Sequence, residues 1–457
     1  MMDEDVDILI VGAGACGLAA AVAAHDAGMS AAVIEKLDRP GGNSSLSTGS
    51  VPAAGSRFQR EAGIVDDPAT YVRDLMGIAK ETDDLALVQR LAEISAETVE
   101  WLVDAVGARI RLVTAYKHIG HSVPRLHAPV SRRGQDLVDD LVAAVEAREI
   151  PIAVGNSARA LIVEDGAVRG AVIDTGGAET AIRARKTILS LNGFAGNADL
   201  VRRFCPEIAG AQYFGALGST GEAVLWGEAL GADLANMAAY QGYAAVAHPH
   251  GSLLSWTTIE KGGFLAGADG RRFGDESLGY SGYARVVLEH GEFAYAVFDQ
   301  KIFDIAAEEE EFAELARFGG LKKADSAEVL AETHGLDAAA LAEELARYNL
   351  AAEGRAPDRH GRTDFGLGPL VAPFYICRVV PGLFHTQGGL RVDGDGRVLR
   401  KDGTAIANLF AGGGAAAGIS GRSGALGYAS GNGLLSAIAL GRLAALAAAG
   451  EIEGSAR

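Results

Sequence analysis

The start of the chain combines two apolar runs with an alanine-rich segment between them. Val6–Val11 is an apolar run broken only by Asp7, which is typical of a parallel strand buried on both faces. The alanine-rich segment through about Ala27 predicts a helix, and Gly28 is a suitable residue to end it. Ala31–Ile34 forms the second apolar run. Together these segments predict a βαβ unit.

The next part of the chain is helical and then changes to strands. Amphipathic patterns predict helices over Pro68–Val106 and Gly134–Arg148. Short alternating stretches separated by glycine turns predict a β-meander at Ile152–Val154, Ala160–Val163, Val168–Ile173 and Thr180–Ile182. A further buried strand is expected at Thr187–Leu191.

The character of the chain changes near Tyr240. Aromatic residues and charged turns follow, strand patterns return near Tyr375, and a last helix is expected from about Asn432 to Ala448. This order predicts an α/β protein, in which a Rossmann-like nucleotide-binding domain is interrupted by an inserted α+β capping domain. The expected boundaries are 1–240 for the first part of the nucleotide-binding domain, 241–374 for the cap and 375–457 for the returning part.

Composition narrows the class of protein. The 457 residues fit two domains, or one domain with a large insertion. A formal charge of −18 argues against nucleic acid and anionic membranes as partners. The three cysteines show neither metal nor disulfide spacing, and His248-Pro249-His250 lacks further ligands, so no metal is expected. No basic leader precedes the first strand and no apolar run is long enough to cross a bilayer, so we expect a cytoplasmic location.

A glycine-rich turn lies between the first strand and the first helix. Gly12-Ala13-Gly14-Ala15-Cys16-Gly17 is followed by Glu35 at the end of the second strand. The first glycine of such a motif makes the tight turn, the second admits a pyrophosphate, and the third lets helix and strand pack closely. The helix start offers free N–H groups to the phosphates, and Glu35 can accept hydrogen bonds from ribose hydroxyls. These residues alone leave both NAD and FAD open.

Additional glycine segments favour the longer cofactor. Gly41–Ser45 follows Glu35 closely, and Gly412–Gly414 and Gly431–Gly433 lie near the end of the chain. Each segment suits a close backbone approach to a ligand. One cofactor that contacts several distant segments fits FAD better than NAD.

On these motifs the chain resembles the superfamily of fumarate reductases and 3-ketosteroid dehydrogenases, which are FAD flavoproteins. The matching segments are Glu35–Gly49, Gly218–Gly231, Gly270–Glu276, Thr386–Asp393 and Leu409–Arg442. The resemblance implies an isoalloxazine ring between the FAD domain and the cap, with the start of the last helix at its pyrimidine end. The implied cofactor-binding residues are Gly12, Gly14, Ala15, Cys16, Gly17, Glu35, Lys36, Gly42, Asn43, Ser44, Gly49, Asn192, Gly193, Gly414, Asn432 and Leu434.

Two positions depart from the family pattern. Membrane-bound members attach FAD covalently through a histidine, and Asn43 stands at that position here. The resemblance therefore implies non-covalent FAD. Members often carry a glutamate where this chain has Gly414, which removes one flavin contact of the family.

The resemblance also identifies the residue that separates two chemistries. Fumarate-reductase-like members protonate an alkene carbon with an arginine while flavin N5 delivers hydride. The ketosteroid dehydrogenases run the opposite reaction with a tyrosine that removes a proton next to a ketone. Counting from Glu276, Tyr280 falls at this position. The reference pKa of tyrosine, about 10, must be lowered, or the proton relayed to a neighbour, for this role near neutral pH; Tyr283, Tyr243 and Tyr116 are the candidate neighbours.

Further residues are expected around the substrate. The resemblance implies that Tyr428 and the N–H group of Gly431 bind the ketone as an oxyanion hole. It implies carboxylate contacts from His385, counted also among the catalytic groups, and from Arg422, whose guanidinium group matches a carboxylate. Tyr243 is expected at the substrate as well. These residues together predict desaturation of a small cyclic keto acid such as 4-oxocyclohexanecarboxylate, the substrate of one family member.

Three alternatives remain open on the sequence. They are a 3-ketosteroid dehydrogenase, a fumarate-reductase-like reductase of an unsaturated carboxylic acid, and a flavin-binding subunit that only docks to a partner. His121, Arg125 and His127 lie on a polar loop that family members place near the flavin, and a structural role is expected for each. The sequence does not identify the electron acceptor, which could be oxygen, a quinone or a carrier protein.

Overall fold

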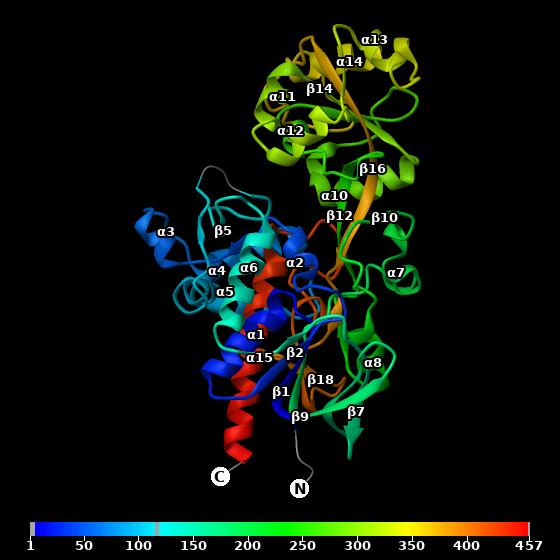
Figure 1. The fold of residues 1–457 in the computed structure, drawn as a ribbon. Helices are drawn as coiled ribbons and strands as arrows, with labels where there is room; N and C mark the ends of the chain where they lie inside the picture. Colours follow the sequence, from blue (N-terminus) through cyan, green and yellow to red (C-terminus); the bar gives the residue numbers. More distant parts are fainter. Residues whose placement is uncertain (1–4, 115–117, 456–457) are drawn as a thin grey trace. The chain divides into compact units, whose positions relative to one another are not determined.

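The computed structural model describes residues 5–114 and 118–455, which divide into two compact units (Figure 1). Unit 1 comprises Met1–Cys205, Gly215–Tyr240 and His385–Arg457, and unit 2 comprises Pro206–Phe214 and Gln241–Phe384. The division after Tyr240 coincides with the expected boundary. The second division falls after Phe384, ten residues later than expected, because β16 (Phe374–Thr386) pairs with strands of unit 2 from Phe374 to Val379.

A largely parallel sheet forms the centre of unit 1. Its strand order is β18-β19-β9-β1-β2-β6, with β7 and β8 attached beside β9. The bounds are β1 (Val6–Val11), β2 (Ala31–Ile34), β6 (Ile152–Ala153), β7 (Ser157–Glu164), β8 (Ala167–Asp174), β9 (Glu179–Leu189), β18 (Arg397–Leu399) and β19 (Ala405–Ala411). The predicted βαβ unit is confirmed, since β1 pairs in parallel with β2.

The predicted meander is correct only in part. Ile152–Ala153 pairs in parallel with β2 and so belongs to the central sheet. Thr180–Ile182 and Thr187–Leu191 were expected as separate strands, but the first segment and most of the second form the single strand β9. The outer half of β9 pairs with β8 and the inner half lies between β1 and β19, so this one strand has three partners along its length.

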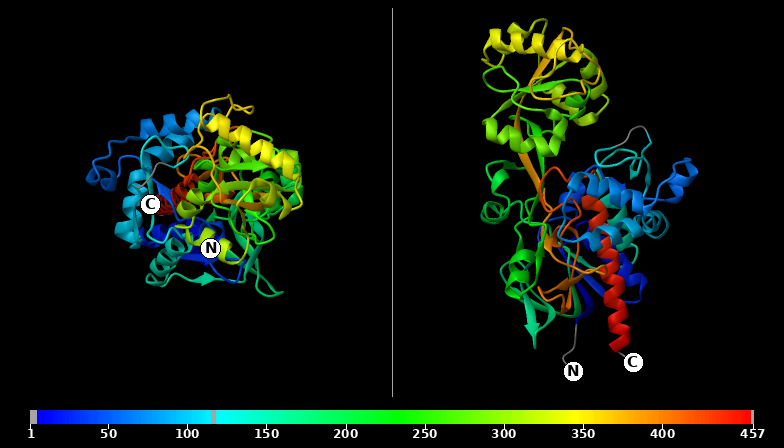
Figure 2. Two further views of the ribbon diagram at one scale, coloured as in Figure 1. Left: turned by 90° about the horizontal axis from the view of Figure 1, so that it is seen from above. Right: turned by 180° about the vertical axis from the view of Figure 1, so that it is seen from behind.

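Two helices from opposite ends of the chain pack together in unit 1, as both views show (Figure 2): α1 (Ala15–Asp26) and α15 (Asn432–Ser455). A Cβ atom on Gly441 would overlap the Cys16 carbonyl group, 2.9 Å from its carbon, so the crossing depends on this glycine. Within the described ranges α15 alone has the length and hydropathy of a membrane span, contrary to expectation. However, 72% of its apolar window is buried inside the protein, as in a core helix.

Other helices of unit 1 follow the amphipathic pattern with interruptions. The stretch expected as helical divides into α4 (Pro68–Ala79), α5 (Leu85–Trp101) and a π-helical turn, η1 (Leu102–Val106). The Asp84 side chain caps α5 by accepting the Leu87 N–H at 3.0 Å. The remaining elements of this unit are α2 (Gly42–Leu46), β3 (Val51–Pro52), α3 (Arg57–Glu61), β4 (Ile110–Leu112), β5 (Leu126–Pro129), α6 (Gly134–Glu146), α7 (Ala198–Phe204), α8 (Glu222–Ala229), β11 (Leu234–Ala235), β17 (Gly389–Leu390), η4 (Gly413–Ala415) and β20 (Ser423–Gly424).

Unit 2 has its own sheet, helices and apolar core. Its strands are β10 (Gln212–Tyr213), β12 (Ala238–Ala247) from Gln241 on, β13 (Phe264–Ala266), β14 (Ala294–Asp299), β15 (Lys322–Ala324) and the first part of β16. Its helices are η2 (Pro206–Ile208), α9 (Thr257–Glu260), η3 (Glu276–Leu278), α10 (Gly279–His290), α11 (Gln300–Ala306), α12 (Glu310–Arg317), α13 (Ala327–Glu332) and α14 (Ala338–Ala352). The unit therefore has the α+β composition expected of the inserted cap.

Candidate functional site

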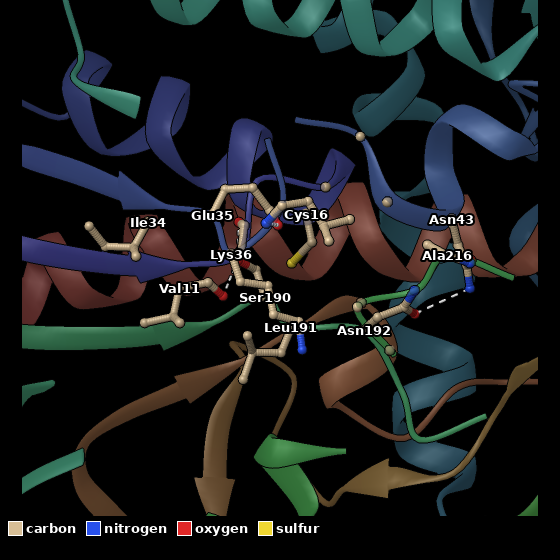
Figure 3. Close-up of a pocket in the computed structure, with 18 of the residues that line it drawn as sticks. Val11, Cys16, Ile34, Glu35, Lys36, Asn43, Ser190, Leu191, Asn192 and Ala216 are labelled. Carbon is tan, nitrogen blue, oxygen red and sulfur yellow. Dashed lines mark hydrogen bonds between the residues drawn. The ribbon is translucent and has the colours of Figure 1, made fainter. Parts of the chain in front are cut away.

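A pocket opens in unit 1 at the carboxyl ends of β1, β2 and β9 (Figure 3). Its empty volume is about 760 Å³, including the part open to solvent. Ligands of open parallel sheets bind at this edge. The expected cofactor residues that line it are Gly12, Gly14, Ala15, Cys16, Glu35, Lys36, Gly42, Asn43, Ser44, Asn192 and Gly414.

The three glycines of the turn have different physical roles. Gly12 has φ +111°, and a Cβ there would lie 2.5 Å from the Ser190 carbonyl oxygen. A Cβ on Gly17 would overlap the Gly12 carbonyl group. At Gly14 a Cβ would make only ordinary contact, 3.6 Å from Gly41 O, so the protein itself does not require a glycine there. The space at Gly14 is instead available to a ligand that approaches the backbone, as the motif predicts.

The start of α1 and the Glu35 carboxylate fit the two halves of an adenosine diphosphate group. Gly14, the N-cap residue, provides no side-chain cap, and the Ala15 N–H donates to Ser44 Oγ at 3.2 Å. The remaining N–H groups of the first turn and the positive dipole end of the helix face the pocket. Glu35 Oε2 accepts the Ala13 N–H and Oε1 accepts the Leu37 N–H, each at 2.8 Å. A carboxylate has about four acceptor sites, so two remain for ribose hydroxyls.

Asn43 connects two other walls of the pocket. Its Oδ1 accepts the Ala216 N–H at 2.7 Å, and its Nδ2 donates to Asn192 Oδ1 at 3.4 Å (Figure 3). A Cβ on Gly414 would lie 2.5 Å from the Gly193 nitrogen. The chain therefore has no room at this position for the glutamate that relatives often carry.

Five expected cofactor residues do not line this pocket. Gly17 and Gly193 are close-packing positions, since a Cβ on Gly193 would overlap the Thr386 hydroxyl. Gly49 has φ +67°, and a Cβ there would lie 2.9 Å from Pro129 Cδ. Asn432 and Leu434 are buried in the first turn of α15. A direct cofactor contact for these five residues remains a prediction.

Several lining residues were missed from the sequence. They are Val11, Ile34, Leu37, Asn156, Ser157, Ala158, Ser190, Leu191, Ala216, Gly218, Glu222, Trp226 and Ala437. Gly41 and Gly413 also line the pocket and lie in glycine segments that were expected to approach the cofactor. Most of the missed residues have no chemical signature, because they contribute backbone or apolar surface. Glu222 could have been found only by its pairing with Lys36, at 2.7 Å between Nζ and Oε1, across a long sequence separation.

His385, Tyr428 and Gly431 lie together at the start of α15. The rings of His385 and Tyr428 are 6.2 Å apart and nearly perpendicular. His385 Cε1 lies 3.7 Å from where a Cβ on Gly433 would be, so the imidazole covers the first turn. Burial lowers the pKa of His385, which favours the neutral ring. No oxygen of the described residues accepts the Gly431 N–H, which leaves it available to a ligand.

Arg422 has different surroundings from these three residues. Its side chain is 60% exposed, and Nε donates to Asp83 Oδ1 at 2.9 Å. A second carboxylate, that of Glu81, lies 3.7 Å from Nη1. A substrate carboxylate would have to compete with these two, so the structure gives the predicted carboxylate contact no support.

Tyr280 lies in the first turn of α10 in unit 2. The helix start is fixed to β12, because Ser281 Oγ accepts the Gly242 N–H at 3.0 Å. The Tyr280 ring is 5.1 Å from that of Tyr243, whose ring is 5.8 Å from Phe384. Phe384 in turn stacks on Phe214 at 6.1 Å. The surroundings of Tyr280 within this unit are therefore aromatic.

Its expected phenolic neighbours differ in what they can do. Tyr243 donates its hydroxyl to the Leu254 carbonyl at 3.0 Å, and burial raises its pKa, so it remains neutral. Tyr283 is fully buried, burial raises its pKa, and its hydroxyl has no partner among the described residues. Neither is suited to take a proton from Tyr280. Tyr116 lies outside the described residues.

The cysteines and His248 lie in surroundings that suggest packing and not chemistry. Cys16, Cys205 and Cys377 are buried free thiols. Residues 5–114 and 118–455 contain no group of three His, Cys, Asp or Glu side chains placed to hold a metal ion. The His248 ring packs against Phe293 at 5.1 Å.

Comparison of the sequence with known families agrees with the nucleotide-binding pocket and the glycine turn. The profile of the family described as FAD binding domain matches residues 7–433. The chain belongs to this FAD-binding family. The fold confirms the expectation: an α/β FAD-binding domain with a capping domain, as in the fumarate reductases and 3-ketosteroid dehydrogenases.

The chain is similar in sequence and fold to fumarate reductases and to a ketosteroid dehydrogenase. A probable fumarate reductase of Shewanella frigidimarina is 29% identical over 96% of this chain and 74% of its own. The open form of a flavocytochrome c3 fumarate reductase superposes with a TM-score of 0.86 at 28% identity, covering 98% of this chain and 78% of the other. For a 3-ketosteroid-Δ4-(5α)-dehydrogenase of Rhodococcus jostii, the TM-score is 0.76 and identity 25%, with 98% of both chains covered. The protein is thus an FAD-dependent oxidoreductase of CH–CH groups next to a carbonyl or carboxylate.

Proposed function

We propose that this flavoenzyme dehydrogenates a cyclic ketone, with Tyr280 as the base that removes the proton next to the carbonyl. The observation that carries the proposal is a tyrosine in the first turn of α10, beside the ring of Tyr243. The resemblance implies that this is the position of the arginine of fumarate reductases. An arginine suits protonation of an unsaturated acid, whereas a phenolate can accept a proton next to a ketone.

The residues of the chain divide the work as follows. Tyr280 takes the proton in its phenolate form, having first released its own proton to solvent, and the positive end of α10 stabilises this negative charge by about 0.3–1 kcal/mol. The Gly431 N–H and the Tyr428 hydroxyl hold the carbonyl oxygen as negative charge develops on it. Bound FAD would supply the hydride acceptor for the β-carbon, and Glu35 and the start of α1 would hold its adenosine diphosphate half.

The class of ketone follows from the surroundings of these groups. The rings of Tyr243, Phe384 and Phe214 favour an apolar cyclic substrate. Arg422 is exposed and paired with Asp83, and His385 is in the neutral form favoured by burial. These surroundings favour recognition of a ketone over recognition of a carboxylate. A keto acid such as 4-oxocyclohexanecarboxylate is one member of the class of cyclic ketones to be tested.

Anaerobic reduction of the flavin tests the proposal. The oxidised enzyme is mixed with cyclohexanone, with 4-oxocyclohexanecarboxylate and with a 3-ketosteroid, and loss of oxidised-flavin absorbance is followed. At least one ketone should bleach the flavin, and Tyr280→Phe should slow bleaching by about 10²- to 10⁴-fold with FAD content unchanged. Tyr283→Phe is the matched control on the same helix. Unchanged flavin with all ketones would refute the proposal.

A second function is favoured by the comparisons. The fumarate reductases are similar over nearly the whole chain, so reduction of an unsaturated carboxylic acid is the competing activity. Chemically reduced enzyme should then be reoxidised by fumarate or urocanate faster than by a cyclic enone. The order of these two rates decides between the functions, and a variant Tyr280→Arg should shift it toward the acid.

A further inference from the structure

The peptide group between Ser430 and Gly431 is held from one side by a buried histidine. His121 Nε2 lies 2.9 Å from the Ser430 carbonyl oxygen. The Ser430 N–H donates to the carbonyl oxygen of Ile119, in the same loop as His121, at 3.0 Å. Gly120, between these two contacts, has no room for a side chain, since a Cβ would lie 2.5 Å from Ala429 Cβ. The loop that carries His121 therefore packs closely against the turn before α15.

The direction of the Gly431 N–H follows from this contact. The C=O and N–H groups of a trans peptide point in opposite directions. With the carbonyl directed to His121, the Gly431 N–H is directed away from it, and no oxygen of the described residues accepts it. Gly431 has φ +83°, and a Cβ there would lie 2.7 Å from Pro52 Cδ, so the turn has little freedom to change.

The protonation of His121 is set by its second neighbour. A carbonyl oxygen only accepts, so Nε2 carries the proton and Nδ1 is an acceptor, which faces Arg125 Nη1 at 3.5 Å. Burial and the nearby Arg125 charge lower the pKa of His121 to about 4, although the Ser430 contact opposes them. The ring is therefore neutral at neutral pH with one tautomer favoured.

Arg125 is itself fixed by two carboxylates. It is fully buried, and Nε and Nη2 donate to the two oxygens of Asp66 at 2.7 and 2.8 Å. Nη1 donates to Asp74 at 2.5 Å. The guanidinium also lies over the Tyr71 ring at 4.8 Å, and the Tyr71 hydroxyl donates to Asn432 Oδ1 at 3.0 Å. This arrangement supports residues on both sides of Gly431.

We propose that His121, held by Arg125, is a positioning residue that aims the Gly431 N–H at the carbonyl oxygen of the substrate. This inference rests on the proposed function, since a ketone is the ligand that develops negative charge on that oxygen. His121 does not touch the substrate; it acts through the Ser430–Gly431 peptide. Its effect is therefore largest for ligands with a full negative charge on oxygen.

Phenols are suitable probes, because a phenolate resembles the enolate of a cyclic ketone. Their dissociation constants are measured on the FAD-loaded protein through the change in flavin absorbance, with toluene as the probe that lacks the oxygen. His121→Leu should weaken phenolate binding about 10- to 100-fold, the range for a hydrogen bond to a charged group, and leave toluene unchanged. His121→Gln, which retains a donor for Ser430, should restore binding to within a few-fold. In turnover, His121→Leu should lower kcat more than it raises KM.

The outcomes separate this inference from the proposed function. If ketones bleach the flavin but His121→Leu binds phenolates as tightly as the native protein, the inference is wrong and the function stands. If the native protein neither binds phenols nor is reduced by ketones, both are wrong. A measurement without any variant covers a misfolded His121→Leu: phenolate should protect the Gly431 amide from hydrogen exchange, and an unprotected amide overturns the inference.

Discussion

Glu35→Gln separates the two roles of this carboxylate, which holds the glycine turn and faces the pocket. Both oxygens already accept a backbone N–H at 2.8 Å, from Ala13 and from Leu37. A glutamine replaces one oxygen by an NH₂ group, so one of these bonds is lost whichever way the amide is oriented. The negative charge that would accept the ribose hydroxyls is lost as well.

The size of the effect follows from hydrogen bonds to a charged group. Each contributes about 1.5–3 kcal/mol, so loss of the ribose contact alone should raise the Kd for FAD roughly 10- to 150-fold. The apoprotein is titrated with FAD and with FMN, which lacks the adenosine ribose, by the quenching of flavin fluorescence. FAD affinity should fall by at least about tenfold more than FMN affinity. Glu222→Gln, at a carboxylate that lines the pocket and pairs with Lys36, is the matched control.

Two results would refute this reasoning. Equal losses for FAD and FMN would mean that Glu35 acts only through the glycine turn. An unchanged Kd for FAD would mean that the ribose does not lie at Glu35, and the position of the adenosine half in the pocket would have to be reassigned.

Three other predictions follow from the same structure. Gly441→Ala should lower the free energy of unfolding by about 1–3 kcal/mol, because the added methyl group would overlap the Cys16 carbonyl. Gly450→Ala, in the same helix, should not destabilise the protein, because no heavy atom lies within 4 Å of the added methyl group. The denaturant midpoints of the two variants test this difference. Trichloroacetic acid should release all flavin into the supernatant, because Asn43 offers no imidazole; flavin retained in the pellet would show a covalent link elsewhere. Burial lowers the pKa of His121 and of His127 to about 4, so between about pH 6.5 and pH 4 the unfolded chain binds more protons and the apparent Tm should fall as the pH falls. His121→Gln should make that fall shallower, and an identical slope would contradict the assignment of a buried neutral imidazole.

The nucleotide-binding half of the fold was predictable because its signals are local. A buried strand, a glycine turn and an acidic strand end occur within one short segment, so spacing alone places Gly12, Gly14 and Glu35 in the pocket. The motif also predicted that Gly17 acts through packing, and a Cβ there would indeed overlap the Gly12 carbonyl group. The β16 boundary was misplaced because a strand pattern shows that a segment is extended but not which strands it pairs with.

The substrate residues were less predictable because their environment is built by distant segments. Arg422 fits a carboxylate by its chemistry, yet Asp83 and Glu81, far away in sequence, already surround it. Tyr280 could be placed by counting from Glu276, but the Tyr243 ring beside it and the Phe384 ring beyond Tyr243 come from two strands distant in sequence. The position of His121 behind Gly431 had no sequence signal, since it depends on a loop folding against the start of α15.

The packing of α1 against α15 has a consequence for how the chain folds. The face of α1 that packs against α15 has no partner there until that much later helix has been synthesised. Unit 2 consists mostly of one continuous segment, Gln241–Phe384, and its contacts close earlier. Contacts between distant segments slow folding, and domains made of continuous segments fold as units during synthesis. The cap is therefore expected to fold while unit 1 is still incomplete, and unit 1 to need protection of α1 from aggregation until α15 arrives.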